Sequence, residues 1–101
     1  MAPRAHYEAE VMALGSAATR MLDAGVSQEH VARWIVAQRN ALKQRFRALT
    51  PPDDRVRLEA WTLGRYGNAL GPSVEWLRDA GKSWREIIDG ATRPGRYRGR
   101  P

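Results

Sequence analysis

The side chains best suited to chemistry are basic residues that recur every four positions in one segment. Arg39, Lys43 and Arg47 have this spacing, and Asn40 lies beside them. On an α-helix such residues form one ridge, which here borders the apolar stripe of the segment. Arginine and lysine bind phosphate oxygens, and no acidic residue occurs from Arg33 to Arg47. The pattern indicates a phosphate-binding surface, and a merely solvated helix face is the alternative.

A glycine-containing segment, 65–73, is the second candidate. Its two glycines let a backbone approach a ligand closely, and Asn68 tolerates a left-handed turn. Arg65 is suited to hold phosphate, and Tyr66 to stack on a base or donate a proton. An ordinary loop between helices uses the same residue types, so both interpretations stay open.

The third candidate is the turn Gly81-Lys82-Ser83, which superficially matches the end of a nucleotide-binding loop. It lacks the upstream glycine and the preceding strand that this mechanism requires. We expect Lys82 to contact an anion near the helix start that Ser83 caps. The chain has two histidines, His6 and His30, and a ribonuclease site with a pair of catalytic histidines would need both of them. We expect His30 to be a partly buried packing residue whose neutral form the helix dipole favours.

Composition narrows the range of functions. The 101 residues include 17 Lys and Arg against 11 Asp and Glu, a net charge of +6, which favours a polyanionic partner. We expect a nucleic acid, and RNA in preference to DNA. The absence of cysteine excludes disulfides, thiolate metal sites and a cysteine nucleophile. No spacing resembles a metal site, so we expect neither a metal nor a small-molecule cofactor. No apolar run approaches the roughly 20 residues of a membrane helix, and we expect no membrane partner.

The apolar periodicity predicts an all-α fold, with a single helical domain over residues 1–92 and a basic, disordered tail over 93–101. The compact bundle has five expected helices, at about residues 6–24, 28–49, 53–66, 73–80 and 83–91. Ser27, Ser73 and Ser83 are expected N-caps, and Ser83 forms a capping box with Glu86.

The third expected helix is capped by Asp53 and is expected to bury its large apolar residues, Val56, Leu58, Trp61 and Leu63. The four tryptophans fall near apolar faces, so we interpret them as core residues first and as base-stacking groups second. These are Trp34, Trp61, Trp76 and Trp84.

Three motifs in order resemble the C-terminal toxin domains of bacterial polymorphic toxins, of the contact-dependent inhibition and Rhs types. They are Arg39-Asn40-x-x-Lys43, Arg65-Tyr66-Gly67-Asn68-x-x-Gly71-Pro72-Ser73 and Leu77-x-x-x-Gly81-Lys82-Ser83-x-x-x-Ile87-Ile88-x-x-Ala91. The resemblance covers about residues 30–94. Ala69 departs from it, since the family usually has proline there, and this loosens the loop.

The resemblance implies a domain secreted as the C-terminal part of a larger bacterial protein and released into the cytoplasm of a target cell. Many such domains cleave RNA, often transfer RNA, and a cognate immunity protein neutralises them in the producer. We expect this immunity protein to be acidic, because a basic site selects a complementary inhibitor. A host factor in the target cell is a further partner that we consider.

For a metal-independent ribonuclease we expect attack by the ribose 2′-hydroxyl on the adjacent phosphate. Arg39, Lys43 and Arg65 would stabilise the phosphate, and Tyr66 or His30 would move a proton. The expected RNA-binding residues are Asn40, Arg47, Asn68, Lys82 and Ser83. The alternatives are a non-enzymatic helical nucleic-acid-binding module, and a helical module that binds proteins.

Overall fold

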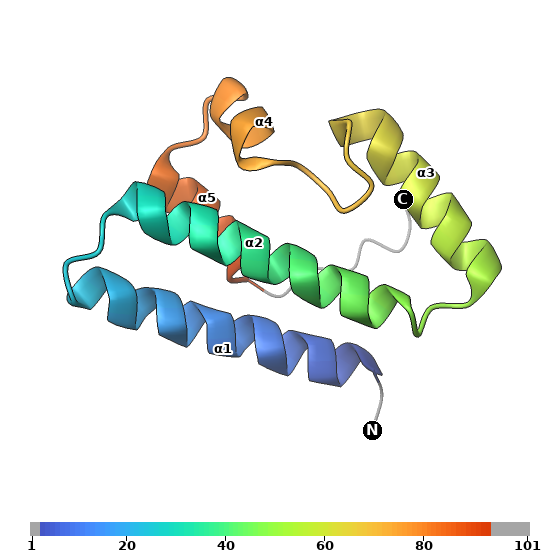
Figure 1. The fold of residues 1–101 in the computed structure, drawn as a ribbon, viewed down its shortest axis with the longest axis horizontal. Helices are drawn as coiled ribbons and strands as arrows, with labels where there is room; N and C mark the ends of the chain where they lie inside the picture. Colours follow the sequence, from blue (N-terminus) through green and yellow to red (C-terminus); the bar gives the residue numbers. More distant parts are fainter. Residues whose placement is uncertain (1–2, 94–101) are drawn as a thin grey trace.

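The computed structural model describes residues 3–93, and within them the chain is all-α, as predicted (Figure 1). It comprises α1 (Pro3–Asp23), α2 (Gln28–Arg47), α3 (Pro52–Tyr66), α4 (Val74–Asp79) and α5 (Trp84–Ala91). The five expected helices are therefore confirmed, with shifts of a few residues at their ends. The predicted basic tail lies outside the described residues apart from Arg93.

The first two helices form a long antiparallel hairpin (Figure 1). Gly25 lies in the turn between α1 and α2. Its φ is +91°, a left-handed conformation that glycine adopts without a steric penalty. Ser27 then caps α2, because its side chain accepts a hydrogen bond from the backbone N–H of His30 at 3.1 Å. The chain reversal thus follows from residues adjacent in sequence.

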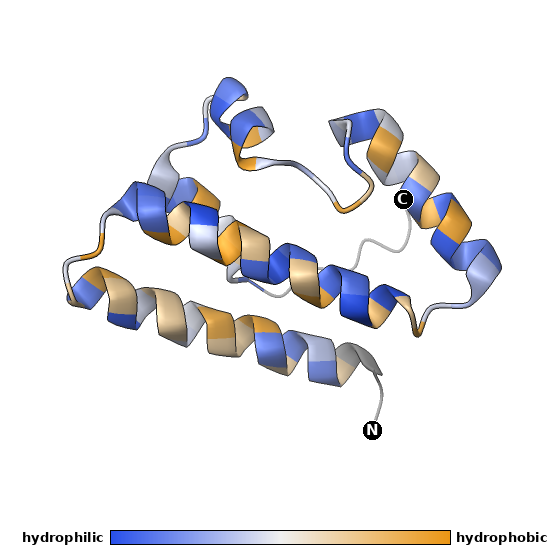
Figure 2. Cartoon of the chain, in the orientation of Figure 1, coloured by the Kyte–Doolittle hydropathy of each residue, from blue (hydrophilic) through white to orange (hydrophobic). Residues whose placement is uncertain are grey.

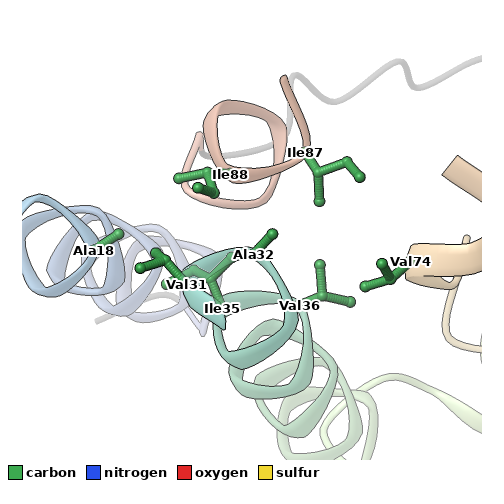
Figure 3. Packing of buried hydrophobic residues seen from close by; sticks show 8 residues of the cluster. All are labelled: Ala18, Val31, Ala32, Ile35, Val36, Val74, Ile87 and Ile88. Atoms are coloured by element: carbon green, nitrogen blue, oxygen red, sulfur yellow. The ribbon is translucent and has the colours of Figure 1, made fainter. Parts of the chain in front are cut away.

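Helix α2 is the centre of the fold. It packs against α1 on one side and against α5 and α4 on the other. The buried cluster draws residues from all four of these helices (Figure 3). Burying a Val or Ile side chain contributes roughly 1.5–3 kcal/mol, so this cluster supplies most of the stability of a small domain. Its members are Ala18, Val31, Ala32, Ile35, Val36, Val74, Ile87 and Ile88.

The two short helices begin at the predicted caps. The side chain of Ser73 accepts from the backbone N–H of Trp76 at 3.0 Å. Ser83 and Glu86 form the predicted capping box, in which each side chain accepts a hydrogen bond from the other residue's backbone N–H. These serines fix where α4 and α5 start, and hence where the turn with Lys82 lies.

Helix α3 stands apart from the other four, and none of them packs extensively on it (Figure 1). The predicted cap by Asp53 is wrong: the helix begins at Pro52, with Pro51 at the N-cap position and no side-chain cap. A proline at the helix start gives up no hydrogen bond, which explains the earlier start.

The predicted burial of the α3 apolar residues is also wrong. Only Thr62 of this helix is buried, whereas Val56 is 64%, Trp61 62%, Leu63 53% and Leu58 43% exposed. At 100° per residue these four positions point in different directions and form no single stripe, so one neighbour could not cover them together. Figure 2 shows this interleaving of hydrophobic and hydrophilic residues along α3. Among the tryptophans, Trp34, Trp76 and Trp84 are half-buried as expected, and Trp61 is not.

Candidate functional site

A cleft of about 470 Å³ lies between α2, the end of the loop before α4, and the turn into α5. It brings together four of the residues predicted for the site, Arg39, Asn40, Lys43 and Lys82. The cleft thus brings together residues of α2 and of the Lys82 turn, and Pro72 is the one lining residue from the glycine-containing segment. The other lining residues are Val36, Pro72, Leu77, Glu86, Ile87, Asp89, Gly90, Ala91 and Arg93.

Lys43 has the largest pKa shift among the residues that line the cleft. Its Nζ donates a hydrogen bond to the carbonyl oxygen of Leu70 at 2.8 Å. Burial, together with the nearby charges of Arg39 and Arg47, lowers the pKa of Lys43 from its ordinary 10.5 to about 8. About a tenth of the amine is then neutral at pH 7, so Lys43 can act both as a cation and as a base.

The loop reaches Lys43 through Gly71. This residue has φ +121°, and a Cβ atom placed on it would lie 2.9 Å from Lys43 Nζ. The backbone angle therefore requires glycine, and a methyl group here would displace the Lys43 ammonium group. The sequence suggested that Gly71 lets a ligand approach the backbone. In the structure it is Lys43 that approaches the backbone at Gly71.

Arg39 joins three elements at the edge of the cleft. Its Nε donates to the hydroxyl of Tyr7 at 3.0 Å, and its Nη1 donates to the carbonyl oxygens of Ala91 at 2.8 Å and Arg93 at 3.0 Å. The last two bonds satisfy carbonyls at the end of α5. Within residues 3–93 all of these acceptors are neutral, so the positive charge of Arg39 is not compensated by a carboxylate. Tyr7 was not singled out from the sequence.

Arg47, the third member of the basic ridge, does not line the cleft. Arg47 is only 9% exposed. Its Nη1 donates a hydrogen bond to the carbonyl oxygen of Ala69 and lies 3.5 Å from a carboxylate oxygen of Glu59. Its Nε has no hydrogen-bond partner in the described part of the chain. Arg47 and Lys43 hold successive carbonyls of one loop, which is a structural role for part of the ridge.

The opposite wall carries both charge signs. Lys82 is exposed, and within the 3–93 range neither its ammonium group nor the Asn40 amide forms a hydrogen bond or ion pair, so both can bond to a ligand. Glu86 and Asp89 also line the cleft and were not singled out as site residues from the sequence, where Glu86 was assigned to the capping box alone. The backbone N–H of Ser83 donates to Glu86 and lowers the pKa of that carboxyl.

Three predicted residues at the end of α3 and in the following loop lie outside the cleft lining. Arg65 is exposed, and its Nε donates to the hydroxyl of Tyr66 at 3.2 Å. The Asn68 side chain accepts a hydrogen bond from the backbone N–H of Leu70 at 2.8 Å and so shapes the loop. The sequence analysis assigns these three residues to the same site as Lys43, whereas in the structure they lie outside the cleft that contains Lys43.

The last two predicted residues are at helix starts. Ser83 is used as the cap of α5. His30 lies in the first turn of α2 and is exposed, so the expectation that it would be a partly buried packing residue is wrong. The backbone N–H of His30 donates to the Ser27 side chain, so His30 belongs to the capped first turn of α2.

Within residues 3–93, no three His, Asp or Glu side chains converge as a metal site would need. None of the described helices is long and apolar enough to cross a membrane. No protein-family model, curated protein or solved structure matches the chain. The geometry of the cleft is accordingly the basis for inferring a function.

Proposed function

We propose that this chain is an RNA-cleaving toxin domain of a larger secreted bacterial protein, acting on RNA, and on transfer RNA in particular, in the target-cell cytoplasm. The observation that supports it is a partly buried lysine of lowered pKa, Lys43, in a cleft that also holds the cations Arg39 and Lys82. The volume of about 470 Å³ is in the range of small-molecule sites, roughly 300–1,000 Å³, and suits one nucleotide. An acidic immunity protein over this cleft stays a prediction.

In this proposal the scissile phosphate lies between Arg39 and Lys82, whose charges stabilise the additional negative charge of the transition state. Neutral Lys43 takes the proton of the ribose 2′-hydroxyl. The 2′ oxygen forms a bond to phosphorus, the bond from phosphorus to the 5′ oxygen breaks, and solvent in the open cleft protonates that 5′ oxygen. Asn40 is placed to bind a base or a phosphate oxygen.

This assignment changes two roles expected from the sequence. Tyr66 and His30 lie outside the cleft lining, so the proton transfer is assigned to Lys43. Arg65 is likewise outside it and is not assigned to the reacting phosphate.

The test is induced expression in a bacterium, followed by denaturing gels of total RNA and DNA, and cleavage assays with the purified chain. We expect growth arrest and RNA fragments, abolished by Lys43→Met. The matched control is Arg45→Ala, an exposed basic residue of the same helix that pairs with Glu10 at 2.6 Å. It should behave as the wild type. Cleavage should accelerate as the pH rises through about 8, because Lys43 loses its proton there. Normal growth with intact RNA would overturn the proposal.

A non-enzymatic nucleic-acid-binding module is the second candidate. The net charge of +6 favours it as much as an enzyme, and each ridge residue already donates to a backbone carbonyl of the fold, on Ala91, Leu70 and Ala69, which is a binding and structural role rather than a catalytic one. Such a module would bind RNA with a strong salt dependence and leave it intact. The cleavage assay separates the two candidates directly.

A further inference from the structure

A group of aromatic and basic side chains lies at the end of α3 and against α4. We name it the α3 platform and define it as Trp61, Arg65, Tyr66 and Trp76. The Tyr66 ring meets Trp76 edge to face at 4.8 Å and Trp61 at 6.3 Å between centroids. The Arg65 guanidinium lies 5.9 Å from the Trp61 ring and 5.5 Å from the Tyr66 ring. The half-buried pair Tyr66 and Trp76 thus supports the exposed pair Trp61 and Arg65.

Trp61 and Arg65 differ from the other arginine–tryptophan contacts of this fold. Trp84 is half-buried and has two arginines near its ring, Arg78 at 4.3 Å and Arg33 at 5.3 Å. Arg33 is neutralised by the carboxylates of two glutamates. Arg65 forms no ion pair with any residue of the described range, and the Trp61 side chain is largely in water. An exposed indole beside an unpaired guanidinium offers a ring face and a positive charge together, and this suits a ligand that is both aromatic and anionic.

We propose that the α3 platform binds an unpaired nucleotide of single-stranded RNA, with its base stacked on Trp61 and its phosphate paired with Arg65. Stacking on an exposed aromatic side chain with an adjacent arginine is the general mode of sequence-tolerant single-strand binding. The inference deepens the proposed function, because it adds a binding subsite for the same substrate outside the cleft.

Two observations favour RNA over a protein as the occupant. The chain carries a net charge of +6, and the cation of the α3 platform is unpaired. The exposed apolar residues of α3 do not form the continuous stripe that a helix-binding protein partner would cover, since Val56 and Leu63 point away from Leu58 and Trp61. The platform is instead a local aromatic and basic pair.

The α3 platform is close enough to the cleft to share one strand. Tyr66 belongs to the platform and Pro72 to the cleft, and the chain between them spans at most about 22 Å when fully extended. At 3.4 Å per stacked nucleotide this is about six nucleotides. An RNA of about twelve nucleotides can therefore occupy both places.

The experiment measures binding of such an unstructured RNA by fluorescence anisotropy, with the full chain carrying Lys43→Met so that cleavage does not interfere. Adding Trp61→Ala should weaken binding about tenfold, the usual effect of removing a stacking side chain. Adding Leu63→Ala, at an equally accessible apolar position of the same helix, should change affinity less than twofold. Arg65→Gln should reduce the dependence of affinity on salt by about one counterion.

An RNA of the same length with abasic positions should bind equally to the variants with and without Trp61. Unchanged affinity in Trp61→Ala, or an equal loss in Leu63→Ala, would overturn the α3 platform as a stacking site and leave a protein as its occupant. RNA binding that depends on Trp61, in a chain whose wild type cleaves nothing, would overturn the proposed cleavage alone. Wild-type cleavage with binding independent of Trp61 would overturn only the stacking site.

Discussion

The lowered pKa of Lys43 leads to a stability prediction that does not depend on any activity. The folded pKa of about 8 lies below the ordinary value of 10.5. Between these two pH values the unfolded chain holds a proton that the folded chain has lost, so deprotonation favours the fold. Stability is therefore lowest below about pH 8 and rises as the pH increases toward 10.5. At about 1.4 kcal/mol per pKa unit, the full rise is about 3 kcal/mol.

Lys43→Met removes this titration while keeping a side chain of similar length. Between pH 7 and pH 10 we expect the free energy of unfolding of the wild type to rise by about 2–3 kcal/mol relative to that of the variant. This corresponds to a relative rise in Tm of roughly 10–20 °C for a domain of this size. The measurement is thermal or urea unfolding at a series of pH values, analysed as the difference between the two proteins. Tyrosines and other shared groups titrate in both and cancel in the difference.

The matched control is Lys82→Met, an exposed lysine of the same cleft, whose stability profile should stay parallel to the wild type. Superimposable pH profiles for the wild type and Lys43→Met would refute the reasoning. They would mean that water or motion of the loop solvates the ammonium group in solution, and the assignment of Lys43 as a base would lose its support.

Three further substitutions test the loop that Lys43 holds. Gly71→Ala should lower the free energy of unfolding by about 1–3 kcal/mol because of the φ of +121°, and it should abolish cleavage because it displaces the Lys43 amine. Gly67→Ala is the control, since Gly67 has φ +71° and open space around it. It should lower the free energy of unfolding by about 1 kcal/mol and preserve cleavage. Equal activity of the two variants would contradict the close approach of the loop. Arg47→Ala should lower the free energy of unfolding by about 2 kcal/mol, because it leaves a loop carbonyl unpaired; urea unfolding with no change would show that Arg47 does not anchor the loop.

The parts of the fold that could be predicted from the sequence are those determined by neighbouring residues. Ser27, Ser73 and Ser83 mark helix starts because a cap bonds an N–H three residues away. Gly25 and Gly81 mark helix ends through the same φ of +91°. Helix α3 was predicted for the right segment, but its burial was not, since periodicity alone does not say whether another helix lies against it.

The all-helical class, the element order and the basic ridge of α2 follow from residue types and their spacing along the chain. The role of each ridge residue depends instead on contacts between distant segments. Arg39, Lys43 and Arg47 find their acceptors 52, 27 and 22 residues away, and spacing within one helix carries no information on such contacts. Tertiary packing also separated Arg65 from Lys43, because α3 folds away from the bundle. A pKa follows burial and neighbouring charge, and both arise only when distant segments meet.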